Sequence, residues 1–98
     1  METPKFTKGK VRRRCLHEWL PEVDGLVCGP FGLLKGEYSL RYELTHMPSG
    51  YLLRSYRSQR AAKEAVARLL ALPIGWSFRS AKNLKKAVKQ QIQLACLF

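Results

Sequence analysis

The chain has 98 residues, 46% of them hydrophobic, which is the size and composition of one globular domain. Its 18 lysine and arginine residues against 7 aspartate and glutamate residues give a net charge of +11, which is typical of a protein that meets a polyanion. The longest apolar run, Leu69 to Ile74, is far too short to cross a bilayer, and no apolar leader is visible, so we do not expect a membrane protein, a secreted disulfide scaffold or a large multidomain enzyme.

The positive charge is concentrated in the second half of the chain. Residues 1–49 carry eight basic and six acidic side chains, whereas residues 50–98 carry ten basic side chains and one acid, Glu64. Like charges at this density repel one another, which favours a polyanionic partner. Nucleic acid is the commonest such partner, an anionic membrane surface or an acidic protein surface would also suit it, and a merely solvated basic surface is the simplest alternative.

Residues 1–14 are predicted to form a basic, flexible arm, and residues 15–98 a single domain. Pro4 and Gly9 discourage regular structure in the arm. Its basic residues are Lys5, Lys8, Lys10, Arg12, Arg13 and Arg14. We expect such an arm to become ordered when it binds an anion.

The segment after the arm is mildly acidic and rich in turn residues. Trp19 and Leu20 precede Pro21 and are predicted to enter the core. One short strand is expected around residues 26–28. The glycine-rich run over 29–36 lacks the Gly-Lys-Ser/Thr ending of a phosphate-binding loop, so we interpret it as a turn.

A hairpin is predicted over residues 37–56. Its first strand, 37–46, alternates apolar and polar side chains with a period of two, so its apolar face should be buried against Val66 and Leu69 of the helix that follows. This apolar face consists of Tyr38, Leu40, Tyr42 and Leu44. Residues 47–50 read Met-Pro-Ser-Gly, which is a turn sequence, and residues 51–56 form the second strand.

A helix is predicted over residues 59–71. Ser58 precedes it, and the serine hydroxyl can accept a free backbone N–H at the helix start. Glu64 is four residues from both Arg60 and Arg68, a spacing that supports a helix. The apolar stripe consists of Ala62, Ala65, Val66 and Leu69.

A second, basic amphipathic helix is predicted over residues 81–94, with Ser80 as its cap. Before it, Ile74, Trp76 and Phe78 alternate with small residues, which favours a short buried extended segment. The apolar face of the helix consists of Leu84, Val88, Ile92 and Ala95.

Three sets of basic residues are candidates for nucleic-acid contact. The first is the opposite face of the second helix, where four ammonium groups lie close together with no acid nearby: Lys82, Lys85, Lys86 and Lys89. The second straddles a strand and a helix N-terminus, where free N–H groups also favour anions: Arg54, Arg57, Arg60 and Lys63. The third is the arm, with Arg12, Arg13 and Arg14. For each set the plain alternative is a solvated face.

Catalysis, metal binding and a cofactor are not expected. Cys15, His17, Cys28 and His46 lack the tight ligand pairs of a zinc module, and no nucleophile stands near a base. Three cysteines cannot all pair within one chain and no Cys-x-x-Cys occurs, which favours reduced thiols and a cytoplasmic location.

The segment from Tyr56 to Ala65 reads Tyr-Arg-Ser-Gln-Arg-Ala-Ala-Lys-Glu-Ala and follows the predicted hairpin. Over about residues 37–72 this order resembles AP2-like and integrase arm-type DNA-binding modules, in which a strand ends in an aromatic residue and a capped, alanine-rich helix packs on the sheet. Double-stranded-RNA-binding domains share the same local pattern. The resemblance to the first family implies that outward residues of the sheet read the major groove, here Arg41, Thr45 and Arg54.

The sequence therefore predicts an α+β domain with a small antiparallel sheet of two or three strands, packed by a helix and followed by a second basic helix. The predicted function is non-catalytic binding of nucleic acid, DNA or RNA, through phosphate contacts. An accessory factor of a mobile element or virus and a subunit of a ribonucleoprotein both fit this function. The alternative is a small protein-interaction module or inhibitor that docks on an acidic surface of a larger partner.

Overall fold

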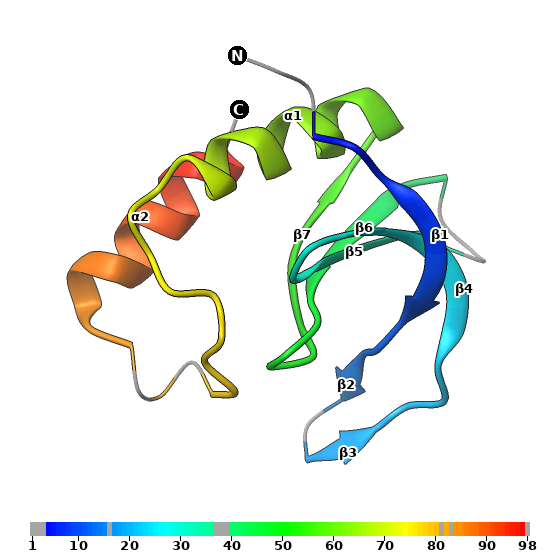
Figure 1. Ribbon diagram of the computed structural model, residues 1–98, viewed down its shortest axis with the longest axis horizontal. Helices are drawn as coiled ribbons and strands as arrows, with labels where there is room; N and C mark the ends of the chain where they lie inside the picture. Colours follow the sequence, from blue (N-terminus) through cyan, green and yellow to red (C-terminus); the bar gives the residue numbers. More distant parts are fainter. Residues whose placement is uncertain (1–3, 16, 37–39, 81, 83, 98) are drawn as a thin grey trace.

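The computed structural model describes residues 4–15, 17–36, 40–80, 82 and 84–97 (Figure 1). The described elements are β1 (Thr7–Val11), β2 (Arg14–Cys15), β3 (Glu18–Trp19), β4 (Val23–Cys28), β5 (Phe31–Lys35), β6 (Tyr42–His46), β7 (Tyr51–Tyr56), α1 (Gln59–Leu70) and α2 (Lys86–Cys96). Five strands form one antiparallel sheet in the order β1-β4-β5-β6-β7, and β2 and β3 pair separately. The α+β class is confirmed, and the main sheet is larger than the two or three strands expected.

Strand β1 lies within the segment that was expected to be a flexible arm. It pairs with β4 from Thr7 opposite Val27 to Val11 opposite Val23, and the Val11 side chain is fully buried. Lys8 and Lys10 are exposed, whereas Gly9 is half-buried on the same side of the strand as Val11. The prediction of irregular structure is therefore wrong for Thr7–Val11, because pairing with β4 satisfies the backbone and buries the inward face.

Strand β5 occupies the glycine-rich run that was interpreted as a turn. Phe31, Gly32, Leu33 and Leu34 are all buried. A Cβ atom on Gly32 would lie 2.6 Å from a methyl carbon of Val11, so glycine here allows β1 to pass close over β5. That glycine marks a close approach between strands, and the turn itself is confined to Gly29-Pro30.

The hairpin of β6 and β7 follows the prediction at its turn and departs from it at its start. Gly50 has a φ of +75° and its N–H donates to the carbonyl of His46 at 2.7 Å, as a tight turn requires. Leu44 is fully buried, but Leu40 is 84% exposed because β6 begins only at Tyr42. The predicted burial of Leu40 is wrong, and Tyr38 lies outside the described residues.

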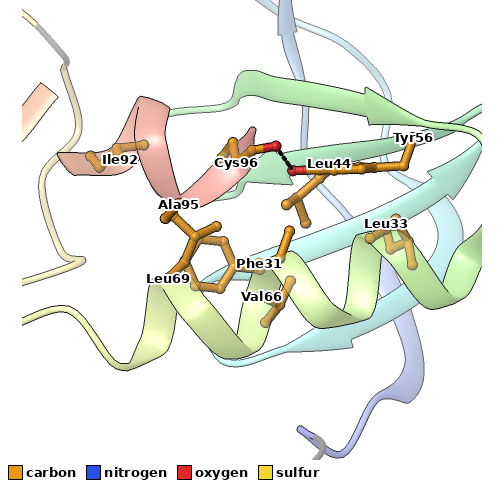
Figure 2. Packing of buried hydrophobic residues seen from close by; sticks show 11 residues of the cluster. Phe31, Leu33, Leu44, Tyr56, Val66, Leu69, Ile92, Ala95 and Cys96 are labelled. Carbon is orange, nitrogen blue, oxygen red and sulfur yellow. Dashed lines mark hydrogen bonds between the residues drawn. The ribbon is translucent and has the colours of Figure 1, made fainter. Parts of the chain in front are cut away.

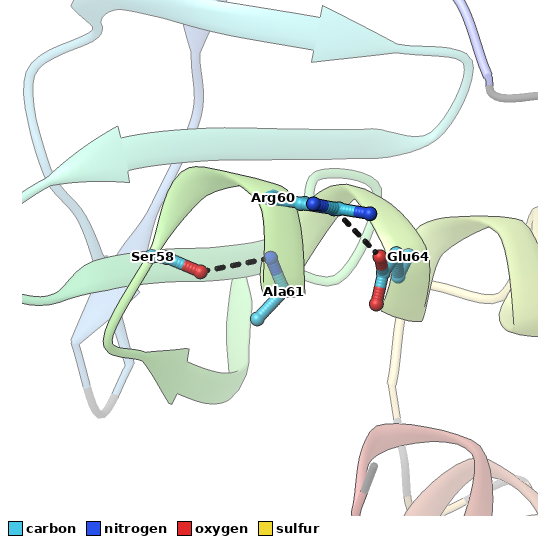
Figure 3. A network of polar contacts seen from close by, with 4 residues as sticks. All are labelled: Ser58, Arg60, Ala61 and Glu64. Carbon is cyan, nitrogen blue, oxygen red and sulfur yellow. Dashed lines mark hydrogen bonds and ion pairs between the residues drawn. The ribbon is translucent and has the colours of Figure 1, made fainter.

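Helix α1 confirms the predicted capping and stripe (Figure 3). The Ala61 N–H donates to the Ser58 hydroxyl at 3.1 Å, and Arg60 pairs with Glu64 at 3.2 Å one turn along the helix. All four residues of the predicted apolar stripe, Ala62, Ala65, Val66 and Leu69, are fully buried.

Helix α2 begins at Lys86, later than the predicted start at residue 81. The Ser80 hydroxyl accepts from the Lys82 N–H at 3.3 Å, so it caps a local turn rather than a helix. Ile92 and Ala95 are buried, as the predicted face requires, and Leu84 and Val88 pack partly against the same core. The helix ends where the Tyr56 hydroxyl donates to the Cys96 carbonyl at 2.8 Å (Figure 2).

The hydrophobic core lies between the sheet and the two helices (Figure 2). Phe31, Leu33 and Leu44 contribute from the strands, and the buried residues of α1 and α2 close the cluster from the other side. Helix α1 contacts β6, β7 and α2. Within the described ranges, neither helix has the length and apolar character needed to span a membrane.

Candidate nucleic-acid interface

An open cleft of about 720 Å³ is lined in part by residues of the β2–β3 hairpin. This hairpin lies at the opposite end of the molecule from α1 (Figure 1). The walls of the cleft come from four parts of the chain: the segment from β1 to the loop between β3 and β4, the β4–β5 turn, the β6–β7 turn and the loop after α1. The lining residues are Lys10, Arg12, Arg14, Trp19, Glu22, Gly29, Pro30, Met47, Pro48, Ser77 and Arg79. The cleft therefore combines four basic side chains, one carboxylate and one tryptophan.

The prediction that Trp19 and Leu20 enter the core is wrong: both are exposed, and Trp19 lies in the cleft. Its side chain is 43% exposed, because β3 pairs only with β2 and stands apart from the main sheet. The Arg12 guanidinium lies 4.2 Å from the centre of the indole ring, and Arg14 lies 5.9 Å from it. Arg14 also lies 5.6 Å from the ring of Tyr51, so the two arginines and two aromatic rings form one cation–π cluster.

Three arginines supply most of the positive charge of the cleft. The Lys10 Nζ lies 2.6 Å from Asp24 Oδ1, and this hydrogen bond raises the pKa of Lys10 and lowers the pKa of Asp24. Within the described part of the chain, no carboxylate lies within 4.0 Å of the guanidinium groups of Arg12, Arg14 or Arg79. These guanidinium groups therefore face the cleft without a neutralising partner of that kind.

Two incompletely satisfied donors lie beside the cleft. The Nε atoms of Arg13 and Arg14 are buried and have no hydrogen-bond acceptor among the described residues. The backbone around them is well bonded, with Arg14 N–H donating to the Gly50 carbonyl at 2.8 Å and Leu20 N–H to the Arg13 carbonyl at 3.0 Å. A buried donor without an acceptor is costly, because its bond to water is lost and not replaced.

His46 fixes the two walls of the cleft that come from the β6–β7 turn and from the loop after α1. It is fully buried, its Nδ1 lies 2.7 Å from the Ser49 hydroxyl, and its Nε2 lies 2.7 Å from the Trp76 carbonyl. A carbonyl only accepts hydrogen bonds, so Nε2 carries the proton. In the neutral ring Nδ1 is an acceptor, and the Ser49 hydroxyl donates to it at 2.7 Å in preference to the His46 carbonyl at 3.2 Å. Burial lowers the pKa of His46, and the bond to Trp76 opposes this only in part.

An aromatic cluster completes this support. The imidazole of His46 stacks on Phe78 with 4.2 Å between ring centres, and Trp76 meets Phe31 edge to face at 5.0 Å. The predicted alternation of Ile74, Trp76 and Phe78 is present, since all three pack partly against the core, but these side chains are half-buried and the segment turns at Trp76 and Ser77. Ser77 and Arg79 lie between and after these anchors, and both line the cleft.

The three predicted basic sets do not share one surface. Of the arm set, Arg12 and Arg14 line the cleft, and Arg13 adjoins them in the chain. Of the junction set, Arg60 and Lys63 line a separate hollow of about 270 Å³ at the start of α1, at the opposite end of the molecule from the β2–β3 hairpin (Figure 1). Arg54 and Arg57 are exposed on β7 and just after it.

The predicted lysine face of the second helix is only partly helical. Lys86 and Lys89 lie on α2, Lys85 is its N-cap residue, and Lys82 precedes it. The prediction of one helical face with four lysines is therefore wrong, because α2 begins about one turn after Lys82. Lys89 lines a third hollow, about 260 Å³ in volume, between β7 and α2.

Sequence reasoning missed Trp19 and Arg79 as candidate site residues. A period-two pattern in the arm would have placed Arg12 and Arg14 on one side of an extended chain, and this is the signal that could have pointed to a shared site. No pattern in the sequence around Arg79 indicates that it lies in the same site as Arg12 and Arg14. Thr45, which the family resemblance implied as an outward residue, is 2% exposed and cannot contact a ligand.

Comparison of the chain with protein-family models, with curated proteins and with solved structures finds no match. Among the residues that the structure describes, no group of three or more His, Cys, Asp and Glu side chains is placed to hold a metal ion. The thiols of Cys15, Cys28 and Cys96 are free. The charge and shape of the cleft are the features from which a function can be inferred.

Proposed function

We propose that the chain is a non-catalytic nucleic-acid-binding protein and that the cleft contacts the phosphate backbone. The observation that carries this proposal is the convergence of Arg12, Arg14 and Arg79 on one cleft beside the exposed ring of Trp19. These arginines come from segments more than 60 residues apart in the chain, so the fold, and not local composition, brings them together.

Arginine suits this task for a physical reason. A guanidinium group presents several N–H donors in a plane, which matches the oxygens of a phosphate, and it remains charged at any physiological pH. Each phosphate that it neutralises releases condensed counterions, which supplies affinity without sequence information. A neighbouring aromatic ring adds a surface on which bases stack.

The basic residues outside the cleft support the proposal because they add to the positive electrostatic potential of the whole protein. The exposed Lys86 and Lys89 of α2, together with Arg54 and Arg57, add positive potential that attracts a polyanion before it docks. Arg60 contributes less, because Glu64 lies 3.2 Å away. The free thiols fit the reducing, cytoplasmic location expected from the sequence.

Fluorescence anisotropy with labelled DNA and RNA of random sequence tests the proposal. We expect both to bind at about 50 mM salt and to weaken steeply toward about 200 mM, with a linear log–log salt dependence. Polyglutamate serves as a competitor, because it carries dense negative charge without phosphates or bases. Absence of binding at low salt, or displacement by polyglutamate at the same charge concentration as unlabelled DNA, would instead favour a module that docks on acidic protein surfaces.

A further inference from the structure

We propose, on the basis of the proposed function, that the cleft binds a single strand and that an unpaired base replaces the Arg12 guanidinium on the ring of Trp19. The released Arg12 then contacts the adjacent phosphate. The nucleic acid is thereby specified by strand state: unpaired DNA or RNA in preference to a duplex.

The aromatic ring in the cleft favours an unpaired strand. The bases of a duplex are paired and stacked on one another, whereas the bases of a single strand are free to stack on aromatic side chains. Here the basic residues and Trp19 line an open hollow of about 720 Å³. A duplex can offer this hollow only its phosphates, whereas a single strand can also place an unpaired base on Trp19.

Trp19 is held in place before any ligand binds. A Cβ atom on Gly50 would lie 2.7 Å from the indole and 2.5 Å from the Cβ of Arg14, so glycine at this position allows the β2–β3 hairpin to rest against the β6–β7 turn. The hydrogen bond from Arg14 N–H to the Gly50 carbonyl secures the same contact. A fixed ring loses little conformational freedom when a base stacks on it.

The exchange of Arg12 for a base is favourable, because base stacking on an aromatic ring is stronger than an exposed cation–π contact. An exposed cation–π contact, such as the one between Arg12 and Trp19 at 4.2 Å, is worth about two- to fivefold in an equilibrium constant. Stacking of a base on an aromatic side chain is worth about five- to 150-fold. Arg12 also gains a phosphate partner when it leaves the ring, which adds to the difference.

The first test compares the wild type with Trp19→Ala and Trp19→Phe on a single strand of about 12 nucleotides and on a duplex of the same sequence. We expect the wild type to prefer the single strand, Trp19→Ala to weaken that binding by about tenfold or more, and Trp19→Phe to retain most of it. The log–log salt slope should stay the same in Trp19→Ala, because no charge is removed. Leu40→Ala, which truncates an 84% exposed leucine outside the cleft, is the matched control and should bind as the wild type does.

A second measurement needs no change at Trp19. In a Trp76→Phe variant Trp19 is the one remaining tryptophan, and its fluorescence should be quenched by oligo-dT but not by heparin, which offers charge without bases. Equal binding of single strand and duplex, with no loss in Trp19→Ala and no quenching, would overturn base stacking while leaving nucleic-acid binding intact. Absence of binding to any nucleic acid would instead overturn the proposed function itself.

Discussion

The Nε2–H of His46 donates to the carbonyl oxygen of Trp76 across 2.7 Å, and this bond joins two loops that both line the cleft. Met47 and Pro48 follow His46 directly, and Arg79 lies three residues beyond Trp76. The buried imidazole therefore links the stability of the core to the geometry of the candidate site. Any change that protonates or removes this ring should therefore lower the stability of the fold and alter the geometry of the cleft.

The first prediction is a loss of stability on mild acidification. Burial lowers the pKa of His46 below its ordinary value of 6.5, so the unfolded chain binds a proton more readily than the folded chain. The stabilising contribution of the neutral ring is complete above pH 6.5 and decreases as the pH falls below 6.5 toward the lowered pKa. Urea unfolding at about pH 7.5 and about pH 5 should show a decrease of at most about 1.4 kcal/mol per pH unit.

The matched variant for this prediction is His46→Gln, whose amide can donate to the Trp76 carbonyl without titrating. We expect it to be less stable than the wild type at neutral pH, because the stacking on Phe78 is lost, but to show a flatter pH profile. An equal slope in the two proteins would mean that another group controls the pH dependence.

The second prediction concerns the register of β6. Leu44 is fully buried in the core cluster, so Leu44→Ala should lower the free energy of unfolding by about 2–5 kcal/mol. Leu40→Ala makes the same chemical change at an 84% exposed position and should cost less than about 0.5 kcal/mol. Chemical denaturation of both variants measures the difference, and similar losses in the two would place the strand in another register.

The third prediction concerns β1. Val11 is fully buried and contacts the site of Gly32, so Val11→Ala should cost about 2 kcal/mol in the free energy of unfolding. Lys8 lies on the same strand with its side chain exposed, and Lys8→Ala should leave thermal stability nearly unchanged. If Val11→Ala has the same melting temperature as the wild type, the segment does not contribute to the folded sheet and is a flexible arm, as the sequence predicts.

The fourth prediction is a gain of binding. Glu22 is the one carboxylate among the residues that line the cleft, and it repels a phosphate backbone there. Glu22→Gln should tighten binding of a single strand by about two- to fivefold at low salt, with less gain at high salt. Glu64→Gln changes the net charge equally at the start of α1, away from the cleft, and should give a smaller gain. Equal gains would show that net charge alone governs the affinity.

Local sequence signals predicted the elements that depend on neighbouring residues. The Ser58 cap, the Ala62–Leu69 stripe of α1 and the Met-Pro-Ser-Gly turn each depend on contacts within a few residues, and all three are present. The strands β1 and β5 were missed because they depend on distant partners. Gly32 looks like a turn residue until Val11 is known to pack on it.

The sequence predicted the basic character of the candidate site but not where in the fold it lies. Arg12 and Arg14 were recognised as candidate contacts, but the arm was not expected to be part of the sheet that positions them. Trp19 looked like a core residue, because an apolar ring before a proline is usually buried and the separation of the β2–β3 hairpin from the main sheet is a tertiary property. Arg79 joins the cleft through long-range contacts of the loop before it, which are the bond between His46 and Trp76 and the packing of Trp76 and Phe78.

The most direct test of the account is the salt dependence of single-strand binding in two variants that lose the same charge. Arg12→Gln/Arg79→Gln removes two exposed cations from the cleft, and Lys86→Gln/Lys89→Gln removes two exposed cations from α2. If the cleft is the interface, the first variant lowers the log–log salt slope by about 1.4, at about 0.7 per phosphate contact, and the second leaves it nearly unchanged. A loss of slope in the α2 variant with none in the cleft variant would contradict the account and move the interface to the second helix.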